Sequence, residues 1–563
     1  MPTPIRAAPF ARPWPWLIAL WVVVTLANLW KPFQLDDTAH LEIARWIAGH
    51  PTRPMSGPLN WVGLVEPIHR TNQPHLFFYL MAGWGRLFGW TEMAMHALQA
   101  LAAGACVVLL HRIAQRIVPD HALWVTAIVV LSPAFVVSQN MMGDVPLLAL
   151  WLWFFDALLD PAPSGGRTRR YLIAAIACTA AILTKYSSLA LLPILAAVPM
   201  IERRWRSIWV IAVPLAGIAA WSAFNVWDYG GIHIAQRNGG SSDALRPFKF
   251  IIAWGLILGG VSPIGLAITS RWSFSVRGKV SLFVVAGTAL AALAVLVAMG
   301  IIAEPFADRV LWVAFAVNGL LIALTLVRPL AMLTRTAFAG LGGLQAQAVP
   351  VVLALWVFGA GAFYVLFPAF SAVRHVLTVL PGLTLLACLS YPEALTRPVK
   401  VAALTFMVPI TMAVSLADYR FADFYRNQST RIAAALSPQL PAGGTIWTSG
   451  HWGWQWYAER AGMQEIDYRR SVPRPGDFYI EAIDVDHQFP TQRLALARVA
   501  KIAQHSHPLN PFCTARPDHF YRSGSRFGPW SLSRACEERL LVYRVVRDRP
   551  PAGSQPEEFD PFK

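Results

Sequence analysis

Long apolar runs, separated by short polar or proline-containing segments, dominate residues 1–417. The hydrocarbon core of a bilayer is about 30 Å thick and needs a helix of roughly 20 residues, so these runs predict about thirteen membrane-spanning helices. They are placed at 14–31, 91–111, 121–140, 145–160, 171–184, 187–201, 207–226, 248–269, 280–302, 310–327, 349–369, 375–391 and 400–417. The pattern predicts an all-α polytopic membrane protein.

Residues 31–90, between the first two spans, are too long for a simple connector. Apolar residues at helical spacing in 37–49 predict a helix that lies in the membrane interface. The segment 74–89 is similarly apolar. If it crossed the membrane, the sides of all later loops would be exchanged, so it is interpreted as a second surface helix.

Composition and charge agree with a membrane protein. Hydrophobic residues make up 56% of the chain and charged residues 14%, while the formal net charge is +16. The basic residues fall in every second loop, which is the positive-inside pattern and makes a nucleic-acid partner unnecessary. They are Arg6, Arg12, Arg112, Arg116, Arg167, Arg169, Arg170, Arg203, Arg204, Arg206, Arg271, Arg277, Lys279, Arg328, Arg335, Arg397 and Lys400. The pattern places the N-terminus in the cytoplasm.

An odd number of spans then places residues 418–563 outside. This segment is long enough for an independent α/β domain. Cys513 and Cys536 lie in this tail and are candidates for a disulfide, with two free buried thiols as the alternative. The cysteines inside predicted spans are expected to be small core residues; they are Cys106, Cys178 and Cys388. The Trp-rich run 452–456 is expected to be a buried or membrane-resting face, or else a sugar platform.

Charged residues from separate segments are expected to meet at the outer face. Asp36 and Asp37 follow the first span, and Asp144 precedes the fourth. Lys185 lies in a tight turn between two spans, and Arg374 with His375 opens the twelfth. Carboxylates near a bilayer cost free energy and usually serve a purpose, so these acids are candidates for a general base.

Each of these residues also has a structural interpretation. Asp36 or Asp37 could cap the interfacial helix, and Asp144 could cap the fourth span. Lys185 and Arg374 could instead reach lipid headgroups. A divalent metal shared by Asp36 and an imidazole four residues later is a further alternative, although three or more ligands are not evident.

Five segments resemble the GT-C superfamily of membrane glycosyltransferases, in the same order along the chain. They are Leu35–Ala44, Gln73–Gly89, Ser132–Leu148, Leu183–Lys185 and Arg374–Pro381. The nearest branches are the bacterial protein O-mannosyltransferases and the aminoarabinose transferases that act on lipid A. This sequence departs from their pattern at Asp37, His375 and Gln73, and its tail matches neither branch.

The resemblance implies transfer of a hexose or pentose from a polyprenyl-phosphate donor to an acceptor hydroxyl, with inversion, at the outer face of a bacterial inner membrane. The acceptor would be a lipid, a glycan or a protein. Asp36 is the expected base, and no metal is assigned. The remaining roles are a catalytic-site role for Asp37 and Asp144, donor-phosphate binding for Lys185, Arg374 and His375, and substrate contact for His40, His69 and His75.

A multi-span transporter or lipid flippase is the competing function, because such proteins also carry charges within the membrane. Transporters usually show paired repeats or matching broken helices, with charged residues near the midplane of the bilayer. Neither feature is evident in this sequence, and its polar residues gather at one face. The pattern therefore favours an enzyme.

Overall fold

The computed structural model describes residues 13–547 except 62, 71–72, 161–166, 237–244, 270–274, 369, 452, 484–493, 505, 516–518 and 535–538. Its larger part is a helical bundle, and each predicted span overlaps one of the bundle helices. These are α1 (Trp14–Leu26), α4 (Glu92–Ile117), α5 (Ala122–Val130), α7 (Asp144–Leu158), α8 (Arg167–Thr184), α9 (Leu191–Ile201), α10 (Ala212–Tyr229), α11 (Arg246–Val261), α13 (Val276–Ala298), α14 (Glu304–Thr325), α17 (Ala348–Leu366), α18 (Leu380–Ser390) and α19 (Arg397–Leu436).

Within the described residues, six helices are long and apolar enough to cross a membrane. Others, such as α1, α9 and α18, belong to shorter apolar segments of 10–17 residues. The chain is therefore a polytopic membrane protein, and the count of about thirteen crossings stays a prediction. Short helices complete the bundle; they are α6 (Pro133–Val137), α12 (Ile264–Thr269), α15 (Val327–Phe338) and α16 (Gly340–Ala346).

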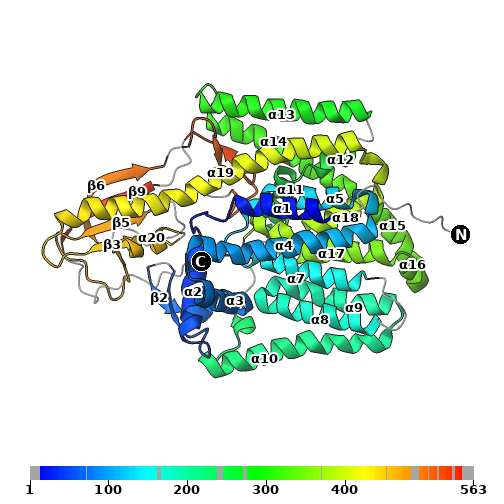
Figure 1. Ribbon diagram of the computed structural model, residues 1–563, viewed down its shortest axis with the longest axis horizontal. Helices are drawn as coiled ribbons and strands as arrows, with labels where there is room; N and C mark the ends of the chain where they lie inside the picture. The colour runs from blue at the N-terminus through cyan, green and yellow to red at the C-terminus, as the bar shows by residue number, and fades with distance from the viewer. Residues whose placement is uncertain are drawn as a thin grey trace.

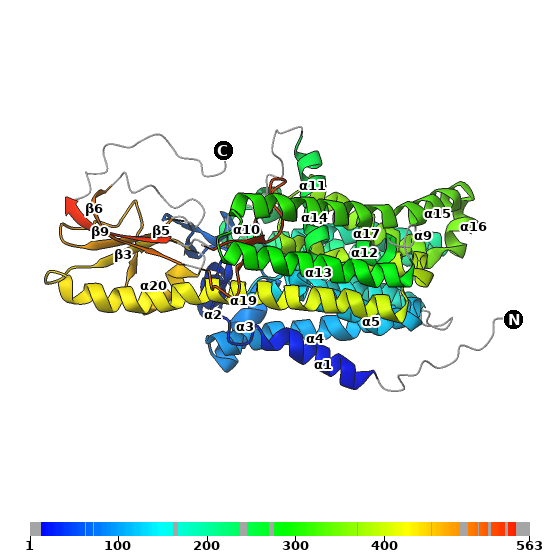
Figure 2. The same cartoon turned by 90° about the horizontal axis from the view of Figure 1, so that it is seen from above.

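The two ends of the bundle differ (Figure 1). The C-terminal sheet projects from one end, and α15 and α16 lie at the other. Figure 2 shows the same separation from above. Arg328 and Arg335, two of the predicted cytoplasmic cations, belong to α15. The arrangement agrees with the alternation of basic loops, while the side of the membrane on which each end lies stays a prediction.

Both helices predicted in the first loop are present, as α2 (Asp37–Gly49) and α3 (Leu76–Phe88). Each of them has 13 residues and is about 20 Å long. α2 packs against α3 and runs across the direction of the long helices (Figure 1). Its apolar face, with Ala39, Ile43 and Ile47, is buried. Between the two helices lie the hairpin β1 (Pro58–Asn60) and β2 (Val65–Pro67) and the turn η1 (Ile68–Arg70).

α19 joins the two parts of the molecule. Its 40 residues make a helix about 60 Å long, roughly twice the thickness of the bilayer core. The helix runs through the domain boundary predicted at 417/418 and continues beside the C-terminal sheet (Figure 1). A rigid element therefore connects the membrane bundle to the tail.

The C-terminal part contains a five-stranded mixed sheet in the order β4-β3-β5-β9-β6. β3 pairs in parallel with β4 and β5, and β9 pairs antiparallel with β5 and β6. With α20 this confirms the predicted α/β character. The bounds are β3 (Ile446–Ser449), α20 (Trp454–Arg460), β4 (Gln464–Glu465), β5 (Phe478–Ala482), β6 (Ala495–Ala503), β7 (Phe512–Cys513), β8 (Ser531–Leu532) and β9 (Arg539–Arg547).

Several tryptophan and cysteine side chains are buried in the structure. Trp454 and Trp456 are buried, as the first interpretation of the Trp-rich run expected. The cysteines of the spans are free and buried; they are Cys106, Cys178 and Cys388. Cys513 is disulfide-bonded. Cys536, its predicted partner, lies outside the described residues.

Candidate active site

The two adjacent acids of the first loop have different environments. The Asp36 side chain is 26% exposed and makes no capping hydrogen bond to α2. Asp37 is fully buried, and its carboxylate accepts backbone N–H bonds from Gln34 at 2.9 Å and Met141 at 2.7 Å. Burial raises the pKa of Asp37 to about 7, against the opposing effect of these donors. Asp37 therefore ties the start of α2 to the segment before α7, and Asp36 is the acid open to a reactant.

The residue immediately before these two acids has an unusual backbone conformation. Leu35 is buried and has φ +52°, a left-handed conformation that costs a residue with a Cβ free energy. Leu35 lies between Gln34 and the start of α2. The carboxylates that follow it have different partners: Asp36 meets Arg374, and Asp37 meets the backbone N–H groups of Gln34 and Met141.

Four of the predicted site residues form one set of ion pairs, here called the charge cluster: Asp36, Asp144, Lys185 and Arg374. Lys185 Nζ donates to Asp144 Oδ1 at 2.7 Å. Arg374 Nε lies 3.7 Å from Asp144 Oδ2, and its Nη2 lies 3.5 Å from Asp36 Oδ2. The sequence prediction that these side chains meet is therefore geometrically correct.

Each member of the charge cluster comes from a different element. Asp144 is the first residue of α7, where the positive end of the helix dipole favours a carboxylate. The N-cap residue of α7 is Gly143, so Asp144 does not occupy the capping position. Lys185 precedes the turn η3 (Tyr186–Ala190), and Arg374 lies in the turn η7 (Val373–Thr378). Because both cations turn inward to acids, the headgroup interpretation of Lys185 and Arg374 does not describe this structure.

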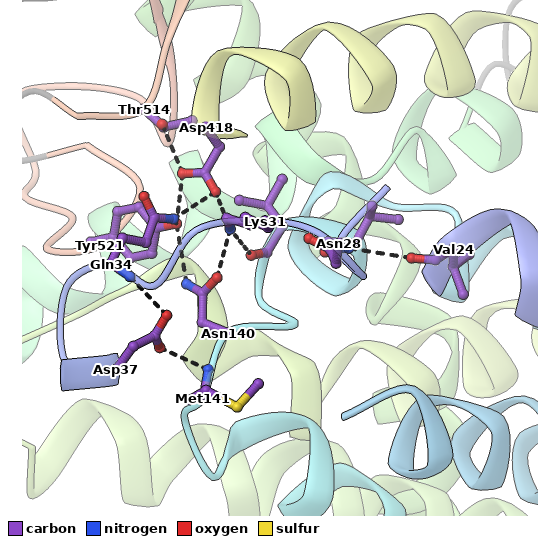
Figure 3. A network of polar contacts seen from close by, with 12 residues as sticks. Val24, Asn28, Lys31, Gln34, Asp37, Asn140, Met141, Asp418, Thr514 and Tyr521 are labelled. Carbon is purple, nitrogen blue, oxygen red and sulfur yellow. Dashed lines mark hydrogen bonds and ion pairs between the residues drawn. The ribbon is translucent and has the colours of Figure 1, made fainter. Parts of the chain in front are cut away.

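The structure also contains a buried polar network that the sequence did not indicate, here called the Asp418 network and drawn in Figure 3. Lys31 and Asp418 form an ion pair with side chains 2% and 1% exposed. The carboxylate of Asp418 also accepts hydrogen bonds from Gln34, Thr514 and Tyr521. Lys31 closes the first predicted span and was the one visible signal, since a lysine at the end of an apolar run needs a partner.

His40 lies one turn after Asp36 on α2. Its Nδ1 is 2.9 Å from the carbonyl oxygen of Met141, so Nδ1 carries the proton and donates it to this bond. Burial lowers the pKa of His40, which keeps the ring neutral. Within the described chain no group of three His, Cys, Asp or Glu side chains could hold a metal ion.

The other predicted histidines pack against aromatic rings. His375 is buried and stacks on Tyr364, with ring centroids 5.3 Å apart. His69 stacks on Tyr229 of α10 at 4.2 Å. His75 meets Phe78 edge-on at 5.1 Å. The ion pairs described above do not include these three residues, and their roles in donor binding or substrate contact stay predictions.

The charge cluster contains two carboxylates and two cations. Asp36 is partly open and can take a proton, while Lys185 offers a point charge and Arg374 a planar fork of donors. These are the groups that bind phosphate and stabilise charge on a departing phosphate oxygen. The cluster can therefore support acid–base chemistry beside an anionic ligand.

Three comparisons with known proteins bear on this site. The family profile described as "Dolichyl-phosphate-mannose-protein mannosyltransferase" matches residues 72–227. A curated relative from Sodalis glossinidius, undecaprenyl phosphate-alpha-4-amino-4-deoxy-L-arabinose arabinosyl transferase 2, is 27% identical over 221 residues. That alignment covers 36% of this chain and 36% of the relative. It therefore spans about a third of the relative's length.

The fold also resembles solved structures at low sequence identity. ArnT from Cupriavidus metallidurans bound to undecaprenyl phosphate matches at 15% identity and a TM-score of 0.39, over 94% of this chain and 98% of that one. The Archaeoglobus fulgidus oligosaccharyltransferase with a tethered acceptor peptide matches at 12% identity and a TM-score of 0.43, over 81% of this chain and 64% of that one.

The resemblance to GT-C glycosyltransferases that the sequence segments carry is confirmed by the family profile and the curated relative. The matched region contains three of the five segments. The segments with Asp36 and Arg374 lie outside it, and the ion pairs join them to the matched region. The apolar helices and the bacterial relative indicate a protein of a bacterial inner membrane.

Proposed function

We propose that this GT-C-like protein transfers a sugar from a polyprenyl-phosphate carrier to an acceptor hydroxyl, with inversion at the anomeric carbon. The charge cluster is the observation that carries the proposal. It brings one accessible acid within 3.5 Å of a cation that also faces a second acid. An enzyme that removes a proton and releases a phosphate needs both kinds of group side by side.

Asp36 is the general base in this proposal. The acceptor hydroxyl attacks the anomeric carbon and passes its proton to Asp36, while the bond between that carbon and the phosphate oxygen breaks. One carboxylate suffices for a single inverting displacement. Asp37 is excluded from this role because both of its carboxylate oxygens accept backbone hydrogen bonds in the interior.

Lys185 and Arg374 hold the donor phosphate in this proposal. Both cations are paired with Asp144 in the structure, so an incoming phosphate shares them with that carboxylate. The phosphate becomes more negative as the sugar leaves, and fixed cations lower the barrier to that change. Asp144 keeps the two cations oriented before the donor arrives.

The donor and acceptor classes follow from the position of the cluster. Lys185 directly precedes the apolar segment Tyr186–Ile201, and Arg374 lies shortly before the apolar helix Leu380–Ser390, which suits a carrier with a long hydrocarbon chain. The acceptor is a lipid, glycan or protein that reaches the end of the bundle bearing the C-terminal sheet. We place this end on the periplasmic side, on the basis of the alternating basic loops.

The experiment uses purified protein in proteoliposomes with polyprenyl phosphates that carry a labelled hexose, pentose or amino sugar. Envelope extracts supply acceptors. We expect label to move from the carrier to an acceptor with wild-type protein and not with Asp36→Asn. Mass spectrometry of envelope glycolipids and glycoproteins, from cells with and without the gene, then identifies the product. Absence of transfer with every donor would overturn the proposal.

A further inference from the structure

The C-terminal tail contacts the charge cluster directly through residues 520–523. The main-chain oxygen of Tyr521 accepts a hydrogen bond from Arg374 Nη1 at 3.2 Å. The backbone N–H of Val373 donates to Phe520 O at 3.0 Å, and that of Ser523 donates to Ser371 O at 2.7 Å. The turn that carries Arg374 is therefore paired, strand-like, with a segment nearly 150 residues later in the chain.

The side chain of the same tyrosine is anchored in the Asp418 network (Figure 3). Its hydroxyl donates to Asp418 Oδ1 at 2.6 Å. It accepts from Gln34 Nε2 at 2.7 Å and from Asn140 Nδ2 at 3.2 Å. Burial raises the pKa of Tyr521, so the hydroxyl keeps its proton and remains a donor.

This network also reaches the proposed base. Gln34 donates to both Tyr521 and Asp418, and it stands two residues before Asp36. The backbone N–H of Gln34 donates a hydrogen bond to the carboxylate of Asp37, and its carbonyl oxygen accepts one from the N–H of Asp37. The hydroxyl of Tyr521 thus contacts the segment before Asp36, while the main-chain oxygen of Tyr521 holds Arg374.

We propose that Tyr521 is a positioning residue, through which the C-terminal tail sets the distance between Asp36 and Arg374. This inference rests on the proposed function and gives the tail a role in it. The lysine–aspartate pair neutralises the buried charge of Asp418, so the phenol has a fixed acceptor. Tyr521 touches neither donor nor acceptor in this proposal; it acts through Arg374 and Gln34.

Tyr521→Phe tests the proposal because it removes one hydroxyl and keeps the ring. We expect the KM for the polyprenyl-phosphate donor to rise roughly 10- to 100-fold, since a cation that loses its support binds the phosphate with poorer geometry. Loss of folded protein would lower the apparent kcat and leave KM unchanged. Direct binding of polyprenyl phosphate without a sugar should weaken in parallel.

Hydrogen–deuterium exchange gives a readout that does not depend on turnover. Amides in 371–375 should exchange faster in Tyr521→Phe. The matched control is Tyr468→Phe, which removes another buried hydroxyl, one bonded to Tyr479 in the C-terminal part at 2.8 Å. It should leave the donor KM and the exchange of 371–375 unchanged.

A milder variant covers the case in which Tyr521→Phe does not fold. Thr514→Val removes one hydrogen bond to Asp418, of 3.0 Å, and leaves Tyr521 in place. It should give a smaller rise in KM and in the same exchange rates. Unchanged KM and unchanged exchange in the folded variant would overturn the inference. An inactive wild-type enzyme would instead overturn the proposed function.

Discussion

Replacing Asp36 by Asn tests the proposed base with little disturbance of the fold. The side chain is about a quarter exposed, and the start of α2 does not depend on it because it makes no capping hydrogen bond. The substitution removes one ion pair with Arg374 at 3.5 Å. A partly exposed pair of this kind contributes about 0–1 kcal/mol to stability. Arg374 keeps Asp144 and the carbonyl of Tyr521 as partners.

The expected effect on catalysis is far larger than the effect on stability. A positioned general base contributes typically 10²- to 10⁴-fold in rate, which corresponds to about 3–5 kcal/mol of barrier. We expect Asp36→Asn to lower turnover by that factor while the affinity for the donor changes little. The assay measures initial rates of sugar transfer over a range of donor concentrations, together with thermal unfolding of the same preparation.

Asp423→Asn is the matched control for this variant. Asp423 lies on α19 near the tail and pairs with Arg426, so the same chemical change removes an ion pair outside the charge cluster. It should leave turnover close to that of the wild type. Near-normal turnover of Asp36→Asn would refute the assignment of the base, and a large fall in its unfolding temperature would refute the claim that the acid is structurally dispensable.

Three further predictions follow from the described contacts. Lys185→Met removes a charge-assisted hydrogen bond and should weaken donor binding roughly 10- to 100-fold. Unchanged donor affinity in a binding titration would show that the phosphate does not bind at Lys185. Asp37→Asn leaves one backbone N–H without an acceptor, so it should lower the free energy of unfolding by about 1–3 kcal/mol while kcat stays unchanged. Loss of kcat at unchanged stability would contradict this prediction. Burial raises the pKa of Glu481 to about 7 from an unfolded value of 4.5, so its folded state favours the protonated acid. The stability that the protonated acid contributes is present below pH 4.5 and is lost as the pH rises to 7. The melting temperature of Glu481→Gln should therefore rise relative to that of the wild type across this pH window. A difference in melting temperature that does not change with pH would contradict this prediction.

The charge cluster was predictable because its members stand out locally. Asp36, Asp144, Lys185 and Arg374 each stand at the edge of an apolar run, where a charge is conspicuous and costly. Their common location followed from the alternation of loops. The helices that overlap the thirteen predicted spans were predictable from their apolar runs, which have few other structures open to them in a membrane. The short helices α15 and α16 were not predicted.

The difference between Asp36 and Asp37 could not be read from the sequence. The two residues are adjacent and chemically identical, and their environments differ because Asp37 accepts two backbone N–H bonds while Asp36 meets Arg374. One of these donors, at Met141, lies 104 residues away in the chain.

The support of Arg374 by the tail was equally hidden. Tyr521 and Asp418 carry no local pattern, and the contact of Tyr521 with Gln34 spans 487 residues. The continuation of α19 past 417 was also missed, because hydropathy falls where the helix leaves the bundle while its backbone continues unchanged. A change in composition marks the edge of the membrane, and it does not mark the end of a helix.

The most direct test of the account follows a labelled sugar in proteoliposomes that contain the purified protein, a polyprenyl-phosphate donor and an acceptor extract. One aliquot is analysed for label on the acceptor, and another for movement of the intact donor between leaflets. The account predicts label on the acceptor with inverted anomeric configuration, and loss of this transfer in Asp36→Asn. Movement of the intact donor across the bilayer without transfer would contradict it and would identify a flippase.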